Sequence, residues 1–172
     1  LFDEEITFYA PSKAKYSWLI PMYKKLEEVV QNVELFTHKT ATAKVLNQIA
    51  KKFNRRSFVV LITDLFNEQE HNDKLFKALQ HLRHERHEVL VFHLLDRKTE
   101  QELEFPNRPM ILQDMESGEK IEVNPHQIRK QYQHNIKRAN AQFKQKCYEF
   151  NISFVVVEIR TPYDKGLTDY LL

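Results

Sequence analysis

Two aspartates stand where a carboxylate could take part in chemistry, because each closes a short apolar run. Asp64 follows the apolar residues 58–62, and Asp96 follows the residues 89–95. Runs of this kind are typical of strands buried on both faces of a parallel sheet, and open α/β sheets bind ligands at the carboxyl ends of such strands. Asp64 is therefore a candidate site residue, with the N-cap of a following helix as the alternative. Asp96 is expected to begin a turn and is a secondary candidate.

Histidines clustered in the sequence raise the question of a zinc site; they are His81, His84, His87 and His93. Their spacing follows the edge of a predicted helix into a loop, without the cysteine or carboxylate that usually completes a zinc site. A histidine near a helix C-terminus also interacts well with the helix dipole, which accounts for His84 or His87 without a metal. The sequence therefore disfavours zinc.

Nucleophilic catalysis has little basis in the sequence. No G-x-S-x-G motif occurs, and Cys147, the one cysteine, falls on the apolar face of a predicted helix, where a thiol usually serves packing. The two glycines, Gly118 and Gly166, are too few for a glycine-rich phosphate-binding loop. We expect that the protein is not an enzyme. The enzymatic alternative is a metal-dependent hydrolase, which would need further carboxylates to converge near Asp64.

The composition indicates a single domain over residues 1–172. Lys and Arg total 26 against 24 Asp and Glu, and the formal net charge of +2 is too balanced to indicate nucleic acid or an anionic membrane as a partner. No apolar run is long enough to span a bilayer, and one cysteine suits a reducing compartment. The cytoplasm is therefore the expected location.

Hydrophobic periodicity predicts helices alternating with strands. Helices are expected over 16–31, with Pro21 in the first turn, over 40–53, where Thr40 or Thr42 would cap the start, over 67–85, over 125–150, and after Pro162. Strands are expected within 55–66, 87–96 and 153–159, and a β-hairpin over 110–112 and 120–123. A strand, helix, strand order implies a right-handed parallel crossover. The sequence therefore predicts an α/β fold.

Three stretches carry a more specific resemblance: RRSFVVLITDLF, LFKALQHLRHERHEVLVFHLLD and ILQDMESGEKIEV. Their order resembles the C-terminal portion of bacterial proteins with a von Willebrand factor A-like domain of unknown function, commonly encoded beside MoxR-type AAA+ ATPases. The resemblance implies a doubly wound, mostly parallel sheet flanked by helices, with a small β-hairpin insertion. It also implies that the N-terminal strand and helix of the domain are missing here, because the chain opens at Leu1 as if within a sheet.

Many members of that family have a metal-ion-dependent adhesion site, and the resemblance assigns two residues to it. Thr40 is similar to the family's threonine, with Thr42 as the alternative, and Asp64 matches the aspartate that follows the fourth strand. Oxygen ligands of this kind suit Mg²⁺. The family's Asp-x-Ser-x-Ser motif is absent and should lie before Leu1, so we expect metal binding by the intact parent rather than by these residues alone.

The resemblance implies a non-enzymatic protein-interaction domain that works with a MoxR-type AAA+ ATPase in protein complex assembly or maturation. A metal-dependent hydrolase on the same fold and a scaffold with a degenerate metal site are the alternatives. The missing strand would also leave a sheet edge unpaired, and an unpaired edge can drive homodimerisation.

Overall fold

A parallel sheet of three strands forms the centre of the protein. The computed structural model describes residues 1–2, 5–10, 15–31, 41–53, 55–65, 69–113 and 118–171. Strands β1 (Phe58–Thr63), β2 (Glu88–Leu95) and β5 (Ser153–Glu158) pair in the order β1-β2-β5. Val60 lies opposite Leu90, and Phe92 lies opposite Val155, so the carboxyl ends of the three strands meet at one edge. The α/β prediction and its parallel crossover are confirmed.

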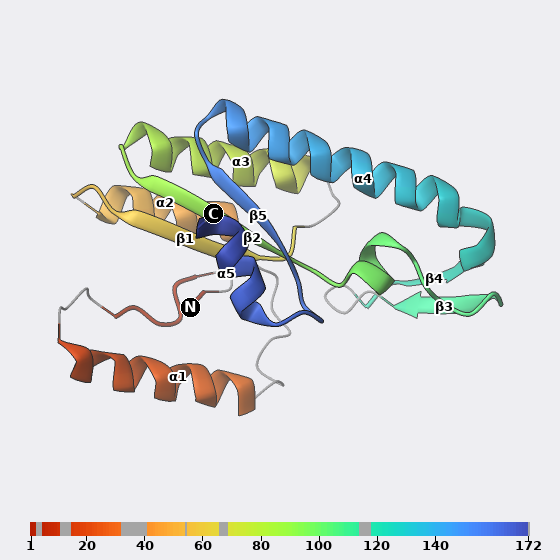
Figure 1. The fold of residues 1–172 in the computed structure, drawn as a ribbon, viewed down its shortest axis with the longest axis horizontal. Coiled ribbons are helices and arrows are strands. Elements are labelled where there is room, and N and C mark those ends of the chain that lie inside the picture. Colours follow the sequence, from red (N-terminus) through yellow and green to blue (C-terminus); the bar gives the residue numbers. More distant parts are fainter. Residues whose placement is uncertain are drawn as a thin grey trace.

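One face of the sheet is covered by three helices: α2 (Thr42–Lys52), α3 (Gln69–His84) and α4 (Pro125–Glu149) (Figure 1). Their apolar stripes meet the inward residues of the strands in one core, in which Leu79 of α3 and Val91 of β2 are each 0% exposed. Helix α5 (Tyr163–Leu171) lies on the opposite face, where Gly166 of α5 leaves room for Val157 of β5. Helices therefore flank the sheet.

Strand β1 differs from its prediction as a fully buried strand. Phe58, Val60 and Ile62 are 52%, 43% and 61% exposed, and Leu61 alone among its residues is buried. The three exposed side chains point to the face opposite α2, α3 and α4, where the ring of Tyr170 stacks on Phe58 at 6.5 Å. An apolar run makes a strand suitable for burial on both faces. Each face is buried only if another part of the structure packs against it. The prediction was wrong for this face.

Two further elements are peripheral to the sheet. Strands β3 (Met110–Gln113) and β4 (Lys120–Val123) form the predicted antiparallel hairpin beside the N-terminal end of α4 (Figure 1). Helix α1 (Leu19–Gln31) follows a 3-10 turn at Tyr16–Trp18 and has Pro21 in its first turn, as expected. None of its residues is buried.

Local details of the helices confirm some predictions and correct one. Helix α2 begins at Thr42, and Ala41 occupies the N-cap position without a side-chain hydrogen bond, so Thr42 does not cap the helix.

Cys147 on α4 is 0% exposed, and burial raises the pKa of its thiol to about 12, which fits the predicted packing role. In the part of the chain that the structure describes, no helix combines the length and apolar character that a membrane crossing requires.

Candidate functional site

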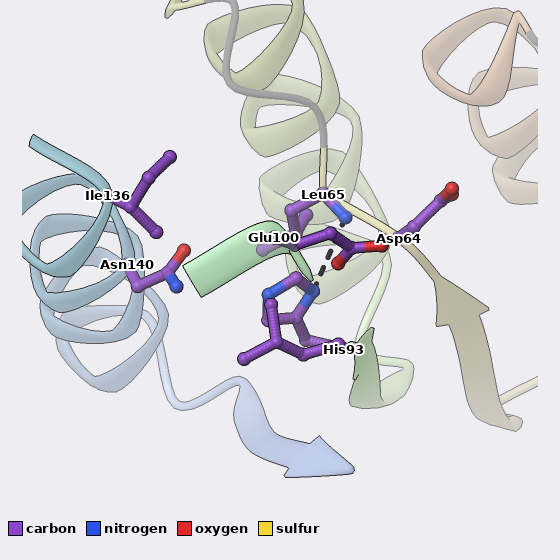
Figure 2. Close-up of a pocket in the computed structure, with 7 residues that line it drawn as sticks. Asp64, Leu65, His93, Glu100, Ile136 and Asn140 are labelled. Carbon is purple, nitrogen blue, oxygen red and sulfur yellow. Dashed lines mark hydrogen bonds between the residues drawn. The ribbon is translucent and has the colours of Figure 1, made fainter. Parts of the chain in front are cut away.

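A cavity of about 190 Å³ opens at the carboxyl ends of the strands, where the sequence places Asp64. Its walls come from four parts of the chain: the end of β1, strand β2, the π-helical turn Arg97–Gln101 and helix α4. The lining residues are Asp64, Leu65, His93, Leu95, Glu100, Ile136 and Asn140 (Figure 2). Polar groups and aliphatic side chains thus share one small space at the edge where α/β sheets bind ligands.

Asp64 lies on the rim of this cavity and is exposed to solvent. Its carboxylate points away from Asn140 (Figure 2), and it makes no hydrogen bond or ion pair with the described residues. Leu65, the residue after Asp64, is not helical, so Asp64 is not the N-cap residue of a helix. Thr40, the second predicted metal ligand, lies outside the described residues.

His93 is the most buried polar residue of the cavity, with 2% of its surface exposed. Its Nδ1 accepts a hydrogen bond from the backbone N–H of Leu65 at 3.3 Å (Figure 2). Its ring stacks on Phe154, with the ring centroids 6.0 Å apart. Its Nε2 has no partner among the described residues. Burial lowers the pKa of His93, while the Thr63 carbonyl and the charge of Asp64 act in the opposite direction. The ring is therefore favoured in its neutral form.

Glu100 and Asn140 face His93 from two other elements (Figure 2). The carboxylate of Glu100 accepts a hydrogen bond from the backbone N–H of Asp96 at 3.2 Å. Burial raises the pKa of Glu100, that hydrogen bond lowers it, and the nearby charges of Asp64 and Asp96 raise it further. Asn140 is half-buried on α4, and its carboxamide forms no hydrogen bond within the described part of the chain.

Asp96 is engaged in structural contacts, as predicted. Its carboxylate accepts hydrogen bonds from Arg160, Nε to Oδ1 at 3.1 Å and Nη2 to Oδ2 at 2.6 Å, and another from the backbone N–H of Lys98. The hydrogen bonds from Arg160 hold the pKa of Asp96 at about 2, against the opposing effect of burial. The pair ties the end of β2 to the segment after β5, and both oxygens of Asp96 are occupied.

The candidate metal ligands do not converge. The described residues contain no group of three or more histidines, cysteines or carboxylates that could hold a metal ion. His81 bonds Asn47 on α2, and His81 and His84 both lie within 4 Å of Glu85 Oε1. His87 lies at the amino end of β2 and His93 near its carboxyl end, so these two histidines are separated by the length of the strand. Three carboxylates, those of Asp64, Asp96 and Glu100, do line a second, adjacent cavity of about 350 Å³.

Comparison with known proteins places the chain in a family. Residues 1–142 match the sequence model of the family described as protein of unknown function DUF58. The chain belongs to this family. No curated protein and no solved structure matches the DUF58 chain.

Sequence reasoning identified Asp64 in this DUF58 chain but did not assign Glu100, Asn140 or Arg160 to the site. Arg160 lies 64 positions from Asp96, the aspartate that it binds, and no local sequence pattern predicts a contact over that separation. One signal was available for His93, a polar residue within an otherwise apolar strand. Such a residue needs a hydrogen-bond partner when buried, and here the partner is the loop after β1.

Replacing Arg160 by methionine should move acid unfolding of the DUF58 chain to higher pH. The pKa of Asp96 is held at about 2 in the folded state, below its ordinary value of 3.8. A folded-state pKa below the unfolded one stabilises the fold above the unfolded pKa, and the contribution is lost as the pH falls through the folded value. Circular dichroism during acid titration measures the midpoint. Arg97→Met is the control, because Arg97 pairs with the separate carboxylate of Glu102; equal shifts in both variants would contradict this role of Arg160.

Proposed function

We propose that the chain is a non-enzymatic protein-interaction domain of the von Willebrand A type that works with a MoxR-type AAA+ ATPase in protein complex assembly or maturation. The observation that carries the proposal is Asp64, an exposed carboxylate at the carboxyl end of β1, on the rim of a cavity and without a partner among the described residues. A carboxylate at this edge of a sheet is available to a partner. The resemblance of the sequence supports the class of domain and the ATPase as the partner.

The proposal includes a metal ion in the intact parent. Thr40 and Asp64 would supply oxygen ligands to Mg²⁺, and a carboxylate of the partner would complete its coordination. The described residues do not form a cation site by themselves, because Asp96 is bound by Arg160 and no three suitable side chains converge. The ion would therefore depend on ligands from outside the described residues. We also expect the protein to act in the cytoplasm and without nucleic acid.

The test is a calorimetric titration of the full-length parent and its Asp64→Ala variant with Mg²⁺ or Mn²⁺, followed by retention of the ATPase with and without chelator. We expect Asp64→Ala to weaken retention by roughly 30-fold, the effect of losing an interface residue worth about 2 kcal/mol. Asp164→Ala is the matched control, since Asp164 is exposed on α5. If Asp64→Ala still bound the metal and the ATPase, the proposal would be overturned and a scaffold with a degenerate site would be favoured. The same binding by Thr40→Ala would have the same meaning.

The hydrolase alternative has one observation in its favour, the three carboxylates around the second cavity. The bidentate contact with Arg160 weakens it, because metal-dependent hydrolysis needs carboxylates that are free to hold the ion. Hydrolysis of p-nitrophenyl phosphate in Mn²⁺ by the parent, abolished by Asp64→Ala, would establish this alternative.

We further propose that the chain forms a homodimer through the edge of β1. This strand pairs with β2 on one side and with no described strand on the other. An unpaired edge presents backbone donors and acceptors to another strand. The exposed side chains of Phe58, Val60 and Ile62 add apolar surface beside that edge, and a second β1 would cover part of it.

A further inference from the structure

The polar groups that line the strand-end cavity define what it can bind. We propose that this cavity takes the carboxamide of an asparagine or glutamine side chain from the partner protein. The inference rests on the proposed function as an interaction domain and adds the chemistry of one contact. The proposal rests on three polar residues that line the cavity: His93 at its base, Glu100 from the turn after β2 and Asn140 from α4 (Figure 2).

The hydrogen bond at Nδ1 fixes the tautomer of His93. The backbone N–H of Leu65 donates to Nδ1, so Nδ1 carries a lone pair, and the proton of the neutral ring must be on Nε2. Nε2 is buried, has no partner among the described residues, and belongs to a side chain that lines the cavity. A buried donor without an acceptor is costly. The base of the cavity therefore calls for a ligand with an acceptor atom.

The carboxylates that line the cavity require a hydrogen-bond donor on the ligand. Glu100 presents a carboxylate that accepts a single described hydrogen bond, from Asp96, and Asp64 adds negative charge at the rim. A ligand carboxylate would be repelled by both. An ammonium or guanidinium group would suit the carboxylates but has no acceptor for His93 Nε2–H. A carboxamide meets both demands, because its oxygen can accept from His93 while its NH₂ group donates to Glu100.

The size of the cavity agrees with a side-chain end group. Its volume of about 190 Å³ is below the roughly 300–1,000 Å³ of pockets that take whole small molecules. The aliphatic side chains of Leu65, Leu95 and Ile136 line the cavity beside the polar groups and can contact the methylene groups of a glutamine or asparagine.

The test uses acetamide as the probe, with acetate and methylammonium as probes of similar size and opposite charges. Nuclear magnetic resonance of the full chain, labelled with ¹⁵N at histidine, follows the ring nitrogens during each titration. We expect a saturable shift of His93 Nε2 with acetamide and none with the two ions. His87 is the internal control, since its Nε2 is also buried and unpartnered but its ring lines none of the cavities described above.

A conservative variant tests the second contact. Glu100→Gln keeps the shape of the side chain and should weaken acetamide binding about tenfold, the usual loss when a hydrogen bond to a charged group becomes neutral. Shifts that rise linearly without saturation, saturation by methylammonium instead of acetamide, or equal binding by Glu100→Gln would each overturn the proposal. If acetamide fails to bind while Asp64→Ala still weakens ATPase retention, the carboxamide contact is disproved and the proposed function stands. If acetamide binds but the parent protein does not retain the ATPase, the carboxamide contact stands and the proposed function is disproved.

Discussion

Replacing Leu79 by alanine is expected to lower the free energy of unfolding by about 2 to 5 kcal/mol, the cost of a large-to-small change in a packed core. Leu79 is 0% exposed on the inner face of α3, within the core that joins α2, α3, α4 and the sheet. The variant loses the transfer free energy of the deleted atoms and leaves a cavity that the surrounding helices fill only in part. Urea denaturation of the full chain measures the loss as a lower midpoint at an unchanged slope.

Lys77→Ala is the matched control, because Lys77 lies on the exposed face of the same helix. An exposed substitution of this kind should change the free energy of unfolding by no more than about 0.5 kcal/mol. If Leu79→Ala cost as little as Lys77→Ala, the inner face of α3 would not be packed as the structure has it.

Replacing Ile62 by lysine is expected to raise the dissociation constant of the proposed homodimer by roughly 30-fold, since a central interface residue is typically worth about 2 kcal/mol. Ile62 is 61% exposed in the isolated chain, on β1 beside the edge that pairs with no described strand. A dimer formed through that edge would cover the side chain, and a lysine there would have to be desolvated. Sedimentation equilibrium over a range of concentrations measures the constant.

Ile111→Lys is the control for this experiment. Ile111 is an isoleucine of similar exposure, 67%, on the peripheral hairpin strand β3. The edge proposal fails if the unmodified chain stays monomeric at every concentration, or if both lysine variants weaken the dimer equally.

Much of the fold was predictable because its signals are local. The apolar stripe of α4 and Pro125 at its start define a helix whose observed bounds, Pro125–Glu149, differ by one residue from the prediction. The apolar runs of β1, β2 and β5 and the hairpin of β3 and β4 were likewise found within their predicted stretches. Hydrophobic periodicity and turn residues are signals within a few positions of each other, so they can be read directly from the sequence.

The site was predictable only in part. Asp64 is at the strand end that the sequence indicated, yet the orientation of its carboxylate and its lack of a described partner depend on the neighbouring turn and helix. The histidines illustrate the opposite case: four of them are close in sequence, and the strand carries His87 and His93 to opposite ends of the sheet. Spacing along a strand separates residues that spacing along a helix would bring together.

By itself the sequence determined the order of helices and strands, the parallel crossover and the position of Asp64 at the end of β1, because these follow from composition and period within short segments. Tertiary structure alone decided that β1 keeps an apolar face exposed, that Arg160 occupies Asp96, and that His93, Glu100 and Asn140 share a cavity. The physical reason is that burial, ion pairing and hydrogen bonding depend on which distant segments meet. His93 and Asn140 become neighbours only when α4 packs across the end of β2.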